Sequence, residues 1–125
     1  MGDMIEGEEV ILDEEYFQFR NISLLTSSLH LSINTSSCSL LGLHETLPNL
    51  CQLTLDGSTI VSIRDLGTKL DQLTYLHIYD CGVSDLDGIG AFPHLVELSA
   101  CNNQINDLSC LAMHSSLQVL FMNNV

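Results

Sequence analysis

Apolar residues recur along this chain with a period of 22 or 23 residues. When Leu50 is counted as position 1, apolar residues occupy positions 1, 4, 6, 11, 14 and 17 of three successive units. Random placement at this composition would not fill every position, so the period predicts a chain of stacked repeats. The repeat residues are Leu50, Leu53, Leu55, Ile60, Ile63 and Leu66, then Leu73, Leu76, Ile78, Val83, Leu86 and Ile89, and then Leu95, Leu98, Ala100, Ile105, Leu108 and Leu111.

Each unit is expected to hold one short strand and a return segment. Positions 4 and 6 alternate with polar neighbours, which is the period of a strand with one buried face. The other apolar positions return along a turn and a short helical or 3-10 segment. One unit cannot bury its apolar face alone, so the units stack and their strands form a parallel sheet. The predicted fold class is α/β: a right-handed leucine-rich-repeat solenoid with the parallel sheet on the concave face and short helical or 3-10 segments on the convex face.

Position 9 of each unit is predicted to stabilise the turn after the strand. This position usually holds Asn, whose side chain satisfies backbone groups that the turn leaves unpaired, and Asn103 fits that role. Cys81 and Ser58 are smaller substitutes. We interpret Cys81 as structural, because a buried free cysteine packs as a small apolar side chain.

The repeats are predicted to span residues 28–125, as one degenerate, three complete and one truncated unit. In the degenerate unit Ser28 is taken as position 1. The residues then predicted to point inward are Leu31, Ile33, Cys38 and Leu41. The truncated unit begins at Leu117 and stops within a repeat, so we expect either further repeats or another cover over this exposed strand edge.

Residues 1–27 are predicted to form an acidic N-terminal tail and a cap. From Asp13 to Leu25 apolar residues alternate irregularly with polar ones, which suggests an amphipathic helix or an irregular cap over the first strand. The first fifteen residues carry a cluster of carboxylates, interpreted as a solvated tail, with an acidic docking segment as the alternative. The cluster consists of Asp3, Glu6, Glu8, Glu9, Asp13, Glu14 and Glu15.

The overall charge excludes two classes of partner. The formal net charge is −13, and Arg20, Arg64 and Lys69 are the only permanently cationic side chains. Nucleic acids and anionic membrane surfaces both require several Lys or Arg side chains. We therefore expect neither a nucleic acid nor a membrane as partner.

Targeting and catalytic motifs are missing from the sequence. The N-terminus lacks the order of a signal peptide, and no apolar run is long enough to cross a bilayer. Five cysteines without CxxC spacing are expected to be free thiols in the cytoplasm.

The histidines are scattered, so we expect no enzyme and no cofactor. A zinc site at His77, Cys81 and Cys101 is conceivable, but strong zinc signals come as closely spaced ligand pairs.

The outward strand positions are the candidate protein-binding site, since a solenoid presents them as one continuous surface. In the degenerate unit these positions are His30, Ser32 and Asn34. The predicted binding residues of the later units are Gln52, Thr54, Asp56, Tyr75, His77, Tyr79, Glu97, Ser99 and Phe121. Three rings on one exposed strand, from Tyr75 to Tyr79, favour an interface. The alternative is that these rings pack against one another across the sheet.

Several segments are more specific than a generic repeat. They are Ser62–Thr68, Cys81-Gly82 with Asp85–Ile89, Asn103 with Ile105 and Asp107–Ser109, and Glu14–Tyr16 before the repeats. Together they resemble the ciliary leucine-rich-repeat proteins required for assembly and transport of axonemal outer dynein arms. The resemblance covers roughly residues 14–125, and family members are longer, with further repeats and a long C-terminal region.

The resemblance implies a non-enzymatic adaptor of the cilium or flagellum. Such proteins link dynein arm complexes to intraflagellar transport, so dynein arm or intraflagellar transport subunits are the implied partners. The alternative function is a regulatory subunit that binds a cytosolic enzyme, such as a protein phosphatase, through the concave face.

Overall fold

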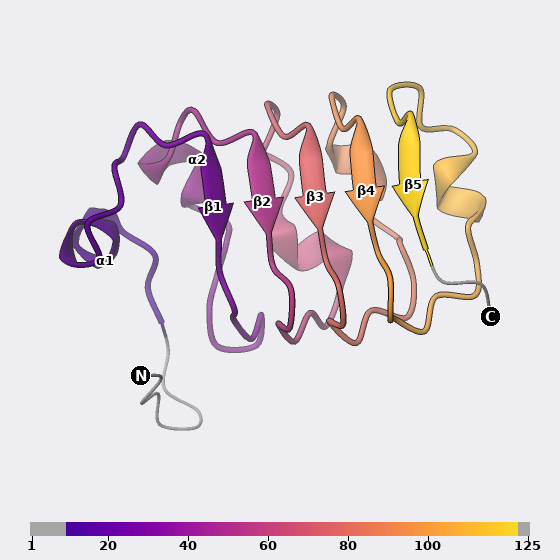
Figure 1. Ribbon diagram of the computed structural model, residues 1–125, viewed down its shortest axis with the longest axis horizontal. Coiled ribbons are helices and arrows are strands. Elements are labelled where there is room, and N and C mark those ends of the chain that lie inside the picture. The colour runs from indigo at the N-terminus through magenta and orange to yellow at the C-terminus, as the bar shows by residue number, and fades with distance from the viewer. Residues whose placement is uncertain (1–9, 123–125) are drawn as a thin grey trace.

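Five short strands lie side by side in chain order and form one parallel sheet (Figure 1). The computed structural model describes residues 10–122. Each neighbouring pair of strands is parallel, as the repeat pattern predicts. The strands are β1 (Ser28–His30), β2 (Gln52–Thr54), β3 (Tyr75–His77), β4 (Glu97–Ser99) and β5 (Val119–Phe121).

The central residue of every strand is a leucine, and in β1 to β4 this leucine is buried in the core. Leu53, Leu76 and Leu98 pair with one another across the sheet and are fully buried. The apolar positions predicted from the repeat are buried in all three complete units except Leu108 and Leu111, in the last of them. Leu108 is 45% exposed. Among the described residues, no later return segment packs against it.

The predicted register of the degenerate unit is wrong by two residues. Leu29, and not Leu31, pairs with Leu53, so the outward residues of β1 are Ser28 and His30. Asn34 lies beyond the strand, where it forms an isolated bridge to the next repeat. Side chains alternate along a strand, so registers two residues apart bury the same face, and the apolar pattern cannot distinguish them.

The return segment of the degenerate unit also differs from the prediction. Leu41, expected inside, is 60% exposed, whereas Leu40 and Leu43 are buried. The predicted inward positions of Leu31, Ile33 and Cys38 are confirmed by their burial. This unit is longer than the others, since 24 residues separate Leu29 from its partner in β2, and the extra length shifts the spacing of the apolar residues that follow.

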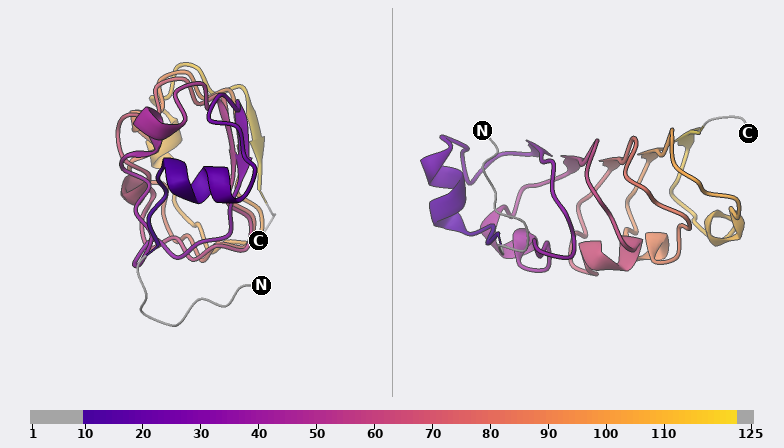
Figure 2. Two further views of the ribbon diagram at one scale, coloured as in Figure 1. Left: turned by 90° about the vertical axis from the view of Figure 1, so that its left-hand side faces the viewer. Right: turned by 90° about the horizontal axis from the view of Figure 1, so that it is seen from below.

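Short helical segments lie along the side of the molecule opposite the sheet (Figure 2), as predicted. They are α2 (Leu43–Thr46) and the 3-10 helices η1 (Ile63–Leu66), η2 (Ile89–Ala91) and η3 (Ser109–Leu111). A short polar side chain precedes the return segment in each complete unit. Ser62 accepts a hydrogen bond from the Arg64 N–H, Asp85 accepts one from Asp87, and Asp107 accepts one from Ser109. These local bonds stabilise the turn into each segment.

The position-9 side chains bond to backbone groups of the turns, as predicted, and they also connect each turn to the preceding repeat. The Asn103 amide oxygen accepts the N–H groups of Cys81 and Val83 at 2.9 and 3.1 Å. Its amide nitrogen donates to three carbonyl oxygens, the shortest bond being 2.7 Å to Ile78. The thiol of Cys81 donates to the carbonyl of Leu55 one repeat earlier.

A seventh apolar position lies three residues before each repeat, and the pattern analysis missed it. Leu47, Leu70 and Phe92 occupy it and are buried, and each carbonyl accepts the N–H of the residue that opens the next unit. In the last repeat the position holds His114, whose Nε2 lies 3.0 Å from the carbonyl oxygen of Phe92. The sequence therefore carried this seventh position as an apolar residue in three repeats, and as a histidine in the last one.

A short helix, α1 (Glu14–Phe19), lies across the N-terminal end of the stack (Figure 2). Asp13 caps it by accepting a hydrogen bond from the Tyr16 N–H at 2.9 Å. Phe17 is fully buried and packs in the core at this end of the stack. Phe19 lies two residues after Phe17, so it faces away from the core and is 84% exposed. Leu25 lies beyond the end of the helix and is 72% exposed.

Two predicted features stay predictions. The acidic tail falls largely on residues 1–9, which lie outside the described residues, as do residues 123–125 at the end of the truncated repeat. The division of the chain between residues 27 and 28 also stays a prediction. Within the part of the chain that the structure describes, no helix is long and apolar enough to cross a membrane.

Truncating Leu76 to Ala should lower the free energy of unfolding by about 2–5 kcal/mol, because it leaves a cavity in the centre of the stack. Urea denaturation would measure the loss. Leu120→Ala is the matched control, since it removes the same atoms from the same ladder position, where the side chain is 39% exposed. An equal loss in both variants would contradict the assigned core.

Replacing Asn103 with Ala should cost about 2 kcal/mol or more, because buried backbone groups lose their hydrogen-bond partners. Thermal or urea unfolding would measure this loss. Gln104→Ala changes the exposed neighbour and should leave stability almost unchanged. If the two variants unfold alike, the amide of Asn103 does not hold the turns together.

Candidate functional site

The outward side of the strands forms a continuous surface, which we refer to as the sheet face. Its members are Ser28, His30, Gln52, Thr54, Asp56, Tyr75, His77, Tyr79, Glu97, Ser99, Cys101, Val119 and Phe121. The residues between them point into the core, and Leu55, Ile78 and Ala100 among these are buried. All nine predicted binding residues lie on this face. Their role in binding stays a prediction.

Register brings the members of the sheet face into rows that run across the strands. Tyr75 lies between Gln52 and Glu97, and His77 lies between Thr54 and Ser99. Asp56, Tyr79 and Cys101 follow the same alternation just beyond the strand ends. Adjacent strands in such a sheet are about 4.8 Å apart. Side chains in one row can therefore contact a single bound segment together.

The rings of Tyr75 and His77 stack at the centre of the sheet face. Their centroids are 5.5 Å apart and their planes meet at 24°. His77 Nε2 lies 2.8 Å from Glu97 Oε2, and the two side chains are 31% and 14% exposed. These contacts hold the imidazole between a ring on its own strand and a carboxylate on the next. The alternative prediction, that these rings pack against one another, describes this pair correctly.

Tyr79 lies outside that stack, and its side chain is 49% exposed. Its backbone N–H donates to Asp56 Oδ1 at 2.9 Å, so the carboxylate of one repeat anchors the strand end of the next. Asp80 follows with a positive φ of 57° and is exposed. Two acidic residues are thus associated with Tyr79: Asp56, which accepts its backbone N–H, and Asp80, which follows it in the chain.

The cationic side chains lie away from the sheet face. The Arg64 Nε donates to Asp87 at 2.8 Å on the opposite side of the molecule, and this carboxylate holds the pKa of Arg64 above its usual value. Arg20 lies over the Tyr16 ring of α1, with its guanidinium carbon 3.7 Å from the ring centroid. Lys69 is exposed between η1 and β3. The charged members of the sheet face are therefore the carboxylates Asp56 and Glu97, beside the exposed rings of β3 and its extension.

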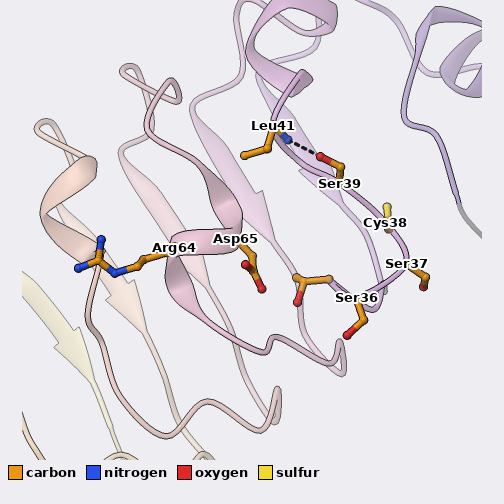
Figure 3. A pocket seen from close by; sticks show the side chains of 8 residues that line it. Ser36, Ser37, Cys38, Ser39, Leu41, Arg64 and Asp65 are labelled. Atoms are coloured by element: carbon orange, nitrogen blue, oxygen red, sulfur yellow. Dashed lines mark hydrogen bonds between the residues drawn. The ribbon is translucent and has the colours of Figure 1, made fainter.

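A shallow pocket of about 460 Å³ lies on the opposite side, between the degenerate unit and η1 (Figure 3). Its lining residues are Thr35, Ser36, Ser37, Cys38, Ser39, Leu41, Arg64 and Asp65. Figure 3 shows the Arg64 guanidinium pointing away from the serines, with the Asp65 side chain between Arg64 and the serines. The guanidinium instead donates to Asp87. The pocket therefore presents hydroxyls and a carboxylate without a free cation, which disfavours an anionic ligand.

The possible zinc ligands are not brought together. Cys81 is buried and its thiol donates to a backbone carbonyl, whereas His77 faces outward and contacts Glu97. Within residues 10–122, no group of three or more metal-ligating side chains is close enough to hold an ion.

Residues 71–113 match the sequence profile of the family described as Leucine Rich repeats (2 copies). Together with the parallel sheet, this match decides the architecture. The chain folds as a leucine-rich-repeat solenoid. No solved structure matches it at a significant level.

Curated relatives of this solenoid carry the name Leucine-rich repeat-containing protein 56. The human protein is 47% identical over 98 residues, which cover 77% of the chain and 18% of the human protein. The rat protein is 47% identical over 105 residues, or 81% of the chain and 19% of its own length. The Trypanosoma brucei homolog is 42% identical over 76 residues, or 59% and 10%. The chain spans less than a fifth of the length of these relatives.

The solenoid should protect two of its cysteines from alkylation. Burial raises the pKa of the Cys38 and Cys81 thiols, and only the thiolate reacts. At pH 7.5 iodoacetamide should therefore modify Cys101, which lies partly exposed on the sheet face, faster than either of them. Raising the pH toward the shifted pKa values should narrow the difference in alkylation rate between Cys101 and the two buried thiols. Peptide mass spectrometry would measure the rates, and in denaturant all five cysteines should react alike. If Cys38, Cys81 and Cys101 react at equal rates in the folded protein, the fold does not protect the two buried thiols.

Proposed function

We propose that this solenoid is a non-enzymatic adaptor that binds another protein through the sheet face. We further propose that it acts in the assembly and transport of axonemal outer dynein arms, in the cytoplasm and the cilium or flagellum. Leucine-rich-repeat proteins are generally protein-interaction modules. The observation that supports this site is the group of outward rings on β3 and its extension, at the centre of the stack.

The central strand supplies the features expected of a binding hot spot. Tyr75 and Tyr79 are 37% and 49% exposed, and Tyr is enriched among residues that dominate binding energy. The stack on His77 fixes the orientation of Tyr75 before a partner arrives. A pre-oriented ring loses less conformational freedom on binding, so more of its contact energy contributes to affinity.

The dynein-arm role is supported by the segments that resemble the ciliary family. In the fold these segments are structural: Ser62 and Asp85 open η1 and the return segment of the next repeat, and Asn103 joins two turns. They identify a type of solenoid and not a binding surface. The partner within the dynein-arm pathway should therefore be identified by affinity purification, by comparing the wild-type chain with variants of the sheet face.

We expect loss of outer dynein arms, with cilia still formed, when the gene is disrupted in a ciliated cell. Re-expression of the wild-type gene should restore the arms. A variant with Tyr75→Ala and Tyr79→Ala should fail, since each anchor is worth about 2 kcal/mol or more at a hot spot. Electron microscopy of axonemes would measure the outcome. Intact arms after disruption would refute the role.

A matched control removes exposed apolar side chains elsewhere. Val61 and Met113 are 67% and 89% exposed, and neither belongs to the sheet face. The variant with Val61→Ala and Met113→Ala should restore the arms. Affinity purification from the same cells separates the alternative function: recovery of a phosphatase catalytic subunit, without dynein or transport subunits, would favour a regulatory subunit of that enzyme.

A further inference from the structure

The sheet face combines exposed rings with carboxylates and carries no permanent positive charge. We infer that its occupant is an arginine-bearing, cationic segment of the partner protein. The inference rests on the proposed use of this face for binding, and it adds the chemistry of the segment that binds. Charge complementarity and the position of the Tyr79 ring carry the argument.

Three carboxylates lie on the sheet face or at its rim. Asp56 and Glu97 are members of the face, and Asp80 follows Tyr79 at the end of β3. Glu97 contacts the imidazole of His77, and Asp56 uses Oδ1 for a backbone N–H. A backbone amide carries no net charge, so it leaves the charge of Asp56 uncompensated.

The chain's own cations cannot neutralise this surface. Arg64 is paired with Asp87 on the opposite side, and Arg20 stacks on α1 at the N-terminal end. Lys69 belongs to the loop before β3 and is exposed there. An approaching cationic segment therefore meets an acidic surface without a competing internal charge.

The ring of Tyr79 favours arginine over lysine. A guanidinium is planar and weakly hydrated, so it can stack on an aromatic face while its N–H groups bond to carboxylates on either side. Asp56 bonds to the backbone N–H of Tyr79, and Asp80 is the next residue in the chain, so two carboxylates are available near Tyr79 as acceptors. The same chemistry already occurs in this chain, where Arg20 lies 3.7 Å from the centroid of the Tyr16 ring.

The width of the acidic surface calls for more than one arginine. Asp56 follows β2 and Glu97 lies on β4, with β3 between them. Two strand spacings amount to about 10 Å. Glu97 is bonded to His77 and only 14% exposed, so a cation can approach only its open edge. One guanidinium held at Tyr79 does not reach that edge, so the segment should carry at least two cationic side chains.

A peptide titration of the full 125-residue chain tests this inference. The probes are three synthetic peptides of equal length, in which glycine alternates with arginine, lysine or glutamate. We expect the arginine peptide to bind more tightly than the lysine peptide and the glutamate peptide not to bind. Amide chemical shifts should move along β2 to β4, and the affinity should fall as salt rises.

Two double variants provide the matched comparison. Asp56→Asn with Asp80→Asn removes two charges from the sheet face, keeps the acceptor for Tyr79, and suits the positive φ of Asp80, because Asn tolerates that conformation. Glu45→Gln with Asp71→Asn removes two exposed charges elsewhere. Affinity for the arginine peptide should fall about fivefold in the first variant and less than about twofold in the second.

Three outcomes would overturn the inference. They are equal binding of the arginine and glutamate peptides, equal losses in the two double variants, and chemical shifts confined to the acidic residues 3–15. If binding fails while the Tyr75 and Tyr79 variants still abolish dynein-arm restoration, the sheet face is the site but its partner is not cationic. If the peptide does not bind and the Tyr75 and Tyr79 variant still restores the dynein arms, the proposed use of the face is wrong as well.

Discussion

A single repeat of this chain has an apolar face that only another repeat can cover, and this constraint shapes the molecule. Leu53 is fully buried because the leucines of β1 and β3 lie on both sides of it. Where a neighbour is missing from the described residues, the same position in β5 is 39% exposed. Burial of a leucine is worth about 1.5–3 kcal/mol, so each repeat stabilises the next one mainly through this ladder.

The hydrogen bonds of the turns add a second connection between repeats, and its strength varies along the stack. Asn103 makes five bonds to the turn of the preceding repeat and to its own. At the equivalent position Ser58 bonds to two groups, Ile33 N–H and the Leu31 carbonyl, the latter at 3.5 Å. A hydroxyl offers one donor and an amide offers two, so the turns are connected most firmly around β3 and β4.

Much of the fold was predictable because stacking repeats the same requirement at a fixed spacing. The strand positions and the buried ladder follow from apolar residues seen three times in the sequence, and the role of Asn103 follows from its position after the strand. The degenerate unit was misplaced because alternation alone cannot distinguish registers two residues apart. The exposure of Leu120 agrees with the exposed strand edge expected there, but that of Leu108 could not be read from the pattern, because it depends on which neighbour lies beyond it and not on its own repeat.

The candidate site was predictable only in part, for a related reason. Strand alternation determines which side chains face outward, so all nine predicted residues lie on the sheet face. It does not determine their contacts, because outward positions are not held by the core and differ between repeats. Two of these contacts depend on the register between strands. In one, His77 approaches Glu97, 20 residues away, and in the other Asp56 anchors Tyr79. The solenoid therefore fixes the backbone of this surface through its buried leucines, while the chemistry of the surface is set by residues that the fold itself does not require.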